Sequence, residues 1–404
     1  MFSVLVRYYN NNEKFRLITK IMSVWLLSRL IMLVMVPVMN MLADTPHDLL
    51  YYMNPWDAEW YKEIAESGYK PPRANGMANW AFFPLYPMVC AGIRLITGGC
   101  IDTYAIGVLV SNVCIIIAVY YAVGFACLEL DVKKYNRCDI ENIIIFLMLA
   151  GPGAVYYSAM YTEAMFTMCV VLCFYNTKKK NYLAAGLFSA LASGTRIVGC
   201  TLIIVLITDM YVDVYRRQEI EAGRLIRSLG SLIKEVIMDA RKLLSLALCP
   251  LGIFAYMMFL DSFCKDAWAF YHVQKAWRTQ KLFPVIGVLF KSCTGQLGAM
   301  SDVKQLNGII LGWLCVYALL LYVIMIVRKH YALGMFGIVA LLVPLTSSVM
   351  STLRFIIGSF VVYIGIAELM LRMKRVRAVI IIVLLAFVEL VCIAAWYFWD
   401  GLLM

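Results

Sequence analysis

The sequence predicts an all-α protein that crosses a membrane many times. Hydrophobic residues make up 63% of the chain and charged residues 15%, and the mean hydropathy is +0.80. A soluble domain is about half apolar and about one quarter charged. The apolar residues fall in long runs, and 104–128 and 378–399 are each long enough to cross a hydrocarbon core of roughly 30 Å as a helix. Helices are expected because a spanning segment must satisfy its own backbone hydrogen bonds.

These runs are expected to form about eleven spans within one domain, residues 1–404. The expected spans are 21–42, 104–128, 140–151, 154–176, 243–260, 306–327, 332–349, 355–371 and 378–399, with two more in 182–213, which is interrupted at Ser193–Arg196. Two long polar loops separate them. The first, 43–98, ends in an amphipathic stretch at 82–98 and is expected to carry helices at the membrane surface. The second is 261–305.

Basic residues predict how the spans are oriented. The segment 1–20 carries four of them before the first apolar run, which is expected to remain as an uncleaved span. If this segment lies inside and 82–98 does not cross, most of the 36 Lys and Arg residues fall in inner loops, above all in 214–242. Such residues accumulate in cytoplasmic loops. The rule explains the net charge of +11 without a nucleic-acid partner, and it predicts both polar loops and the C-terminus outside.

Neither the cysteines nor any short motif indicates a metal or a cofactor. Most of the 13 cysteines lie inside apolar runs, as small buried residues do, and none has the spacing of a zinc site. The chain has no phosphate-binding glycine loop, no Gly-x-Ser-x-Gly and no metal-binding helix pair. It also lacks an Asp-x-Asp motif, so a metal–nucleotide-sugar site is not indicated.

The first outer loop concentrates aromatic and acidic side chains around Asp57. Asp57 follows Pro55 and Trp56, which suits the N-cap or the first turn of a helix. Trp56, Trp60 and Ile64 would form the apolar stripe of a helix at the membrane surface. Such a helix explains the loop without catalysis, and it would also hold Asp57 at the mouth of a membrane cavity. The residues alone leave both interpretations open.

Four ionisable residues lie in or beside the expected spans. Glu163 falls about nine residues into its span, about 13 Å deep at the helical rise, while Arg196 interrupts one span and Arg354 begins another. Charges in a membrane are costly and are usually paired or functional. Arg29 is explained by pairing or by its long side chain. The other three share the outer half with Asp57, which predicts one outward-facing polar cavity, and arginine suits a phosphate.

The second outer loop contains His272, one of three histidines, followed closely by Gln274. At helical spacing Trp268, Tyr271 and Lys275 share a face. The segment fits another surface helix with a solvated or capping His272, and it equally fits a wall of the same cavity.

The order of these features resembles the PIG-V-type mannosyltransferase family, which includes GPI mannosyltransferase 2 and bacterial relatives and belongs to the GT-C class of membrane enzymes. The resemblance covers about 54–360. It is carried by Trp56-Asp57 with Gly68-Tyr69, the Phe82-Phe83-Pro84 segment, Gly151–Glu163, Ala190–Arg196, Ala269–Trp277 and Arg354-Phe355. Asn54-Pro55 departs from the family pattern, which commonly has an arginine before Trp-Asp.

The resemblance implies a GT-C-like bundle that transfers a sugar, expected to be mannose, from a polyprenyl-phosphate donor to a glycan or glycolipid acceptor on the outer face. Asp57 would be the general base of an inverting attack, and Arg354 and Arg196 would hold the lipid phosphate as it leaves. The other expected substrate-binding residues are Trp56, Tyr161, Glu163, His272 and Gln274. No metal and no other cofactor is expected, because the leaving group is already a phosphate monoester.

A transporter or flippase of a polar or lipid-linked substrate is the alternative from another class, since it also needs buried charges and broken spans. It explains less well the two long outer loops rich in Trp, Asp and His, and the sequence shows no inverted repeat. A non-catalytic scaffold would leave Glu163 and Arg196 without a purpose. Short loops favour a bacterial plasma membrane over the endoplasmic reticulum.

Overall fold

The computed structural model describes residues 12–42, 45–218, 224–276, 285–296, 302–346, 349, 352–357 and 359–398. Most of these residues are helical, and none of them lies in a strand. In chain order the helices are α2 (Glu13–Leu42), α3 (Leu49–Met53), α4 (Ala58–Ser67), η1 (Asn79–Ala81), α5 (Leu85–Ile96), α6 (Thr103–Glu129), α7 (Arg137–Leu149), η2 (Ala154–Tyr157), α8 (Glu163–Lys178), α9 (Tyr182–Thr195), η3 (Ile197–Leu202), α10 (Ile203–Arg217), α11 (Arg224–Met238), α12 (Ala240–Leu248), α13 (Leu251–Cys264), α14 (Ala269–His272), η4 (Val273–Ala276), α15 (Val285–Cys293), α16 (Asp302–Val327), α17 (Tyr331–Leu345), α18 (Thr352–Ile357), α19 (Phe360–Leu371) and α20 (Arg375–Tyr397).

Five helices among the described residues are long and apolar enough to cross a membrane. They are α2, α6, η3 continued by α10, most of α16, and α20. A sixth span results if α12 and α13, which are bent by 48° relative to each other, are counted together. The chain is therefore an integral, multi-pass membrane protein. The expected number of about eleven spans is not confirmed, because α5, α9, α17 and α19 are apolar but only 10–17 residues long.

Two expected spans have a different shape in the structure. The span expected at 154–176 was wrong at its start, because Ala154–Tyr157 is a short 3₁₀ turn and α8 begins only at Glu163. Gly153 precedes this turn with a φ of 91°, a conformation that favours glycine. The span expected before the second outer loop divides into α12 and α13 at Pro250, which has no N–H with which to continue the first helix.

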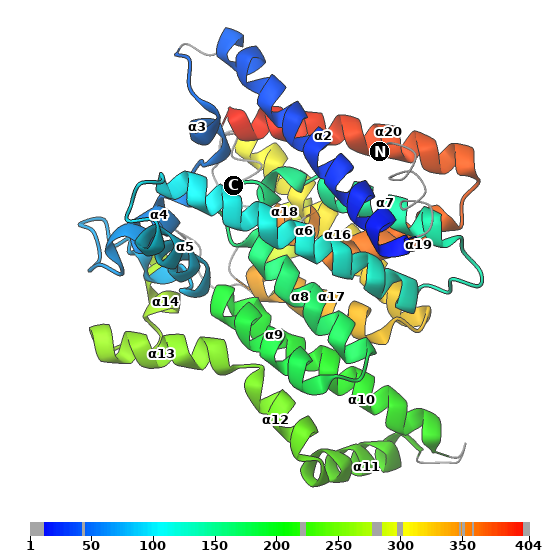
Figure 1. Ribbon diagram of the computed structural model, residues 1–404. Helices are drawn as coiled ribbons and strands as arrows, with labels where there is room; N and C mark the ends of the chain where they lie inside the picture. Colours follow the sequence, from blue (N-terminus) through cyan, green and yellow to red (C-terminus); the bar gives the residue numbers. More distant parts are fainter. Residues whose placement is uncertain are drawn as a thin grey trace.

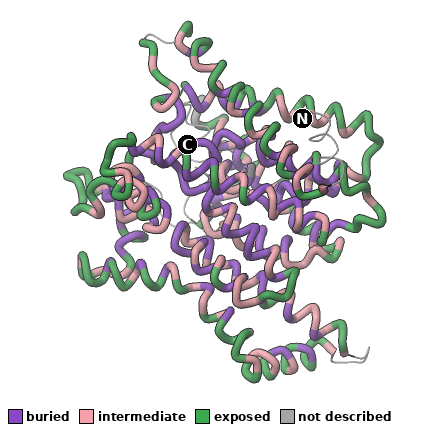
Figure 2. Tube along the Cα trace, in the orientation of Figure 1, coloured by how far each residue is buried: buried purple, intermediate pink, exposed green. Residues whose placement is uncertain are grey.

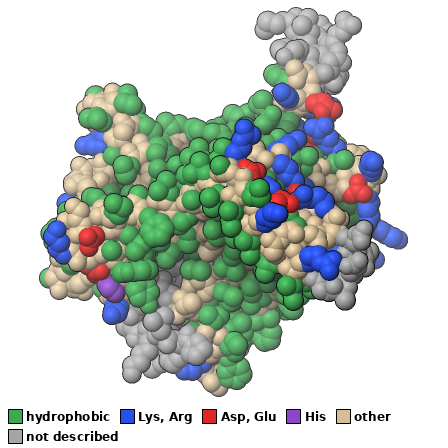
Figure 3. Space-filling model, turned by 90° about the horizontal axis from the view of Figure 1, so that it is seen from below, with side chains coloured by type: hydrophobic (Ala, Val, Ile, Leu, Met, Phe, Trp, Pro, Cys, Tyr) green, Lys and Arg blue, Asp and Glu red, His purple; other side chains and the backbone are tan. Residues whose placement is uncertain are grey.

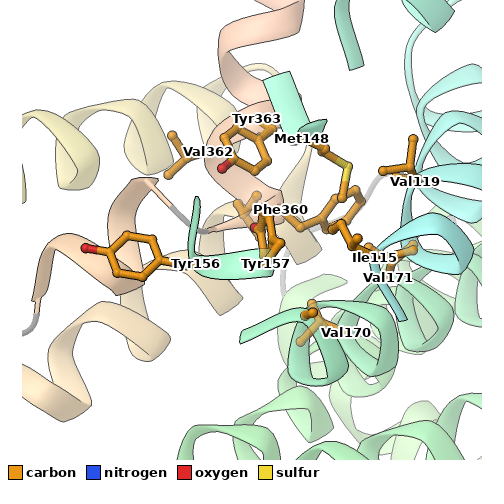
Figure 4. Close-up of a cluster of buried hydrophobic side chains, with 14 of the residues drawn as sticks. Ile115, Val119, Met148, Tyr156, Tyr157, Val170, Val171, Phe360, Val362 and Tyr363 are labelled. Carbon is orange, nitrogen blue, oxygen red and sulfur yellow. The ribbon is translucent and has the colours of Figure 1, made fainter. Parts of the chain in front are cut away.

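The core is built around α6 and α8, which pack against each other, with α9 also packed against α8. In α6, 61% of the most apolar window is buried, against 17% in α2 and 11% in α20. Helices α2 and α20 therefore lie at the periphery, where their exposed apolar side chains would meet lipid (Figures 1 and 2). Figure 4 shows part of the buried core, with labelled side chains that include Ile115, Val119, Met148, Tyr157, Val170, Val171 and Phe360.

Glycines let α9 approach α12 and α13 closely. A Cβ atom on Gly186 would lie 2.4 Å from the backbone oxygen of Ser245, and one on Gly252 would lie 2.3 Å from that of Ala190. Small residues at helix interfaces are common in membrane proteins because they permit this approach. The packing holds the C-terminal end of α9, and with it the neighbouring Arg196, against α13.

The loop 43–98, which was expected to lie outside, begins and ends at the same end of the bundle. Near the end of α2, the Asn40 side chain accepts a hydrogen bond from the Tyr52 hydroxyl of α3 at 2.6 Å. At the start of α6, the Thr103 hydroxyl donates to Glu66 of α4 at 2.6 Å. Both ends of this loop thus lie at one end of the bundle, and its helix α5 packs against α4 and α6.

Ion pairs gather several of the expected inner loops at the opposite end. Arg137 at the start of α7 pairs with Glu13 at the start of α2, at 2.7 Å. His330, which precedes α17, forms a 2.6 Å hydrogen bond with Glu129, the last residue of α6. In Figure 3, Lys and Arg side chains likewise gather toward one end, beside a broad hydrophobic surface. The bundle thus has one basic end, with the Asp57 loop at the other.

Candidate functional site

Asp57 and Arg354 form an ion pair at the start of α4. Asp57 occupies the N-cap position of α4, as expected, but its side chain makes no capping hydrogen bond. Instead its Oδ2 accepts a hydrogen bond from Nη1 of Arg354 at 2.8 Å. The preceding residue, Trp56, has a φ of 46°, which is rare for a bulky side chain and marks local strain. This turn orients the carboxylate away from its own helix and toward α18.

Tyr161 holds the backbone around Asp57. Its hydroxyl donates to the carbonyl oxygen of Pro55 at 2.8 Å and accepts from the Asp57 N–H at 3.1 Å. The side-chain oxygen of Asn54 accepts a third hydrogen bond, from the Met160 N–H at 2.8 Å. The strained turn is therefore tied to the segment between η2 and α8, and Asn54 contributes to this tie.

A buried carboxylate fixes the other end of that segment. The two side-chain oxygens of Glu389, in α20, accept hydrogen bonds from the N–H groups of Gly153 and Val155 at 2.8 and 3.0 Å. Trp396, in the same helix, packs edge-to-face against Trp56 and Tyr161. Helix α20 thus supports the segment 153–161 through both contacts. The Glu389 carboxylate is buried, and these two N–H groups satisfy its hydrogen-bonding capacity.

Arg196 and Glu163 form a second ion pair next to the first. Arg196 has an extended backbone between α9 and η3, so its side chain leaves the helix end. Its guanidinium contacts Glu163 closely and also donates to the Thr162 hydroxyl at 2.9 Å. The Nη1 of Arg354 lies 3.7 Å from the same oxygen of Glu163, which joins the two pairs. Because α8 starts later than expected, Glu163 is the first residue of a helix and does not lie deep within a span.

Two polar atoms of this cluster are buried without a hydrogen-bond partner among the described residues. They are Nε of Arg354 and Oε2 of Glu163. Buried polar groups are rarely unpaired in folded proteins, so each is available to a ligand. Burial disfavours the charge of Arg354, but the nearby carboxylates of Asp57 and Glu163 outweigh it and raise the pKa of Arg354 above its ordinary value. Arg354 therefore stays cationic and suited to an anion.

A cavity of about 270 Å³ opens in front of both arginines. Its polar lining consists of Asp57, Arg196, Arg354 and Gln274 with a few hydroxyl groups, and its aromatic lining of Tyr61, Phe82, Phe83, Phe270, Tyr271 and Phe355. A smaller cavity of about 40 Å³ shares Arg196, Arg354 and Phe355 and continues between α8, α17 and α19. The arginines thus stand between a polar, aromatic-walled space and a narrow, mainly apolar one.

Five of the expected site residues come together here, while three have other positions. Asp57, Tyr161, Glu163, Arg196 and Arg354 form the cluster described above. Gln274 lines the larger cavity. Trp56 packs beneath the cluster against Trp396.

His272 does not line this cavity. Of the two roles expected for it, a solvated position and a place in the cavity wall, the structure shows the first. Its Nδ1 lies 2.7 Å from Oδ2 of Asp266, and its side chain is 52% exposed. The hydrogen bond from His272 lowers the pKa of Asp266 below its ordinary value. On the short helix α14, Tyr271 faces the cavity and His272 the solvent. Trp277, which ends the family-like segment, lies outside the described residues.

Several lining residues were not anticipated as parts of a site. Phe82 lies two residues before Pro84 and Phe355 directly follows Arg354, so their aromatic character was a usable signal, whereas Tyr61 had only its place four residues after Asp57. Trp396 gave no such signal, because it is one aromatic residue in the last apolar run. In the part of the chain that the structure describes, no group of three or more His, Cys, Asp or Glu residues is arranged to hold a metal ion.

Comparison with known proteins gives one match over most of the chain. The family model described as Mannosyltransferase (PIG-V) matches residues 24–400. No curated protein sequence matches the chain.

The likeness to solved structures is weak, as two of those that match show. An Archaeoglobus fulgidus oligosaccharyltransferase tethered to an acceptor peptide has 10% identity and a TM-score of 0.45, covering 94% of this chain and 55% of its own. An oligosaccharyltransferase of the same organism in complex with an inhibitory peptide and a dolichol-phosphate has 11% identity and a TM-score of 0.42, covering 94% and 56%. This chain spans about half the length of those proteins.

Proposed function

This chain belongs to the mannosyltransferase (PIG-V) family of membrane glycosyltransferases, and we propose that it transfers a sugar from a polyprenyl-phosphate donor to an acceptor hydroxyl in the 270 Å³ cavity. Mannose is the proposed sugar, and a glycan or glycolipid the proposed acceptor. The observation that carries the proposal is the juxtaposition of Asp57, the base candidate, with two arginines on the wall of one cavity.

The proposed reaction is a single displacement with inversion at the anomeric carbon. The acceptor oxygen forms a bond to that carbon as the bond to the phosphate oxygen breaks, and the acceptor proton passes to the Asp57 carboxylate. A positioned carboxylate contributes roughly 10²–10⁴-fold to such a step. Arg354 and Arg196 stabilise the phosphate as it leaves with the bonding electrons, since guanidinium groups pair well with phosphate oxygens.

The ion pair between Asp57 and Arg354 implies an order of events. While Arg354 donates to Oδ2 of Asp57 at 2.8 Å, that oxygen is occupied and is not free to take the acceptor proton. A donor phosphate would draw the guanidinium away, using its unpaired Nε as a further donor, and so release the carboxylate toward the acceptor. Donor binding would therefore precede activation of the base. Tyr161 and Asn54 would keep the Asp57 backbone in place during this exchange.

Other parts of the proposal concern the surroundings of the reaction. We place the active site on the non-cytoplasmic face, because the expected inner loops lie at the opposite, basic end of the bundle. A bacterial plasma membrane is the proposed location. We propose a metal-independent reaction that needs no other cofactor, because the arginines can supply the positive charge. Transfer should therefore persist in excess EDTA, and a loss restored by added Mg²⁺ or Mn²⁺ would contradict this part.

The function is tested by transfer of labelled mannose from polyprenyl-phosphate mannose to lipid or glycan acceptors by the purified protein. Asp57→Asn should lower turnover by roughly 10²–10⁴-fold while donor binding is kept. Glu59→Gln is the matched control, because Glu59 is an exposed carboxylate of the same helix. Wild-type turnover by Asp57→Asn would refute the assigned base. Failure of the wild type with every lipid-phosphate sugar, together with measured translocation of such a lipid, would favour a transporter or flippase.

A further inference from the structure

Helix α11 carries an exposed apolar stripe far from the candidate site. Ile226, Leu229, Ile233 and Ile237 follow one another at helical spacing and are 79%, 51%, 53% and 66% exposed. Leu225 widens the stripe at one edge. A helix that is exposed on such a wide apolar face is not stable against water, so another apolar phase must cover that face.

The other sides of α11 have different surroundings. Ser228 and Leu232, one turn apart, are buried against the bundle, where α10 is the neighbouring helix. Hydrogen bonds from the Arg217 guanidinium to Glu235 at 3.0 Å and from the Gln218 amide to the Ser231 hydroxyl at 2.9 Å fasten this contact. Arg227 and Lys234 are exposed on a third side. The helix thus separates bundle, apolar phase and water around its circumference.

The apolar stripe is continuous with a surface that faces the bilayer. Helix α12 follows α11 after one residue, and it exposes Leu243 and Leu244, while α13 continues with Leu251 and Phe254, each about half exposed. The pair α12–α13 is long and apolar enough to form a bent span. Figure 1 shows the three helices in succession along the lower edge, and Figure 3 shows the hydrophobic surface of that side.

The surroundings of α11 are basic. The segment 215–242 carries seven Lys or Arg residues and four Asp or Glu residues. Arg216, at the end of α10, lines the same cavity as Lys180 and Lys329, so the chain enters α11 from the basic end of the bundle. An apolar face flanked by lysine and arginine is complementary to a bilayer interface with anionic headgroups.

We propose that α11 is an interfacial anchor, which buries its apolar stripe in the bilayer at the basic end of the protein and binds anionic lipid headgroups through Arg227 and Lys234. A docked protein would need an acidic surface with its own apolar ridge, and it would have to displace lipid from the continuous α12–α13 surface. The bilayer covers all three helices at once. This role is independent of sugar transfer.

Crosslinking tests the contact of the stripe. A benzophenone amino acid is placed at position 229 or 234 of the full-length protein in liposomes of phosphatidylcholine mixed with phosphatidylglycerol. Position 229 should crosslink to lipid acyl chains, and position 234 should do so at least several-fold less. Crosslinks from position 229 to another protein, or equal lipid yields at both positions, would overturn the proposal.

Hydrogen exchange tests the choice of lipid. The amides of α11 should exchange more slowly in nanodiscs that contain phosphatidylglycerol than in phosphatidylcholine alone. The Arg227→Gln/Lys234→Gln variant should lose most of this protection, about 25-fold at roughly fivefold per basic residue. Lys133→Gln/Lys134→Gln removes equal charge from another exposed loop and should keep it. Equal exchange in both membranes, or equal loss in both variants, would overturn the assignment.

Discussion

Nη1 of Arg354 donates a 2.8 Å hydrogen bond to Oδ2 of Asp57, a residue 297 positions earlier in the chain. The contact joins the first polar loop to the short helix before α19, and it places a carboxylate and a guanidinium on one cavity wall. In the proposed reaction these two groups separate when the donor phosphate binds.

The Arg354→Lys variant should lose donor affinity more than it loses stability. Lysine keeps the charge but cannot offer the planar fork or Nε, which is unpaired here. We expect kcat/KM for the donor to fall roughly tenfold or more, since a charged hydrogen bond is worth about 1.5–3 kcal/mol. Arg377→Lys, at an exposed position in α20, is the control. Unchanged kinetics in Arg354→Lys would remove Arg354 from the phosphate site.

The Tyr161→Phe variant should lower both turnover and stability. The lost hydroxyl leaves the Pro55 carbonyl and the Asp57 N–H without their 2.8 and 3.1 Å partner, which costs about 1–3 kcal/mol. Because the Asp57 turn loosens, kcat should fall while donor KM changes little. Tyr317→Phe, at an exposed tyrosine, controls for loss of a hydroxyl. A rise in KM alone would indicate a substrate contact instead.

The His272→Ala and Gln274→Ala variants should differ in activity, although the two residues are only two positions apart. Gln274 lines the cavity, whereas His272 pairs with Asp266 at the surface. An exposed pair contributes under about 1 kcal/mol, so His272→Ala should stay within about twofold of wild type. Gln274→Ala should lose up to about tenfold if it binds the sugar through a neutral hydrogen bond. The reverse ranking in a steady-state assay would mean that α14 turns when substrate binds.

Because of His330, we expect the protein to become less stable to unfolding as the pH rises. Burial disfavours its charge, but the hydrogen bond to Glu129 and the carboxylates of Glu129 and Glu368 raise its pKa above the ordinary value. A raised folded-state pKa means that the stabilisation is complete below the unfolded pKa, about 6.5, and is lost as pH passes the folded value. The melting temperature of the detergent-solubilised protein should therefore fall over that range.

The His330→Gln variant is the comparison for this pH dependence. It keeps a hydrogen-bond donor but cannot titrate, so its melting curve should be flatter across the same pH range. His272→Gln, at an exposed histidine, should retain the wild-type slope. Identical slopes in the wild type and His330→Gln would assign the pH dependence to other groups.

Sequence patterns predicted where the helices of the bundle lie better than they predicted how many of them cross the membrane. Hydropathy located the apolar helices, and the structure confirmed the break at Arg196. Both the helices and this break could be predicted because they depend on local composition. The 154–176 span failed at its start because Gly153 and the segment after it form a turn that apolar content does not reveal. That turn decides the position of Glu163, and with it the geometry of the second ion pair.

The sequence alone determined a helical membrane protein with one basic end, a polar loop around Asp57, and four charged residues that needed an explanation. It could not determine which carboxylate would meet which arginine, that Tyr161 would hold the Asp57 turn, or that His272 would face away from the cavity. Those outcomes depend on the packing of α4, α8, α18 and α20, which are far apart in the chain. Local periodicity describes which face of a helix is apolar, whereas only the tertiary contacts decide which polar groups come within hydrogen-bonding distance.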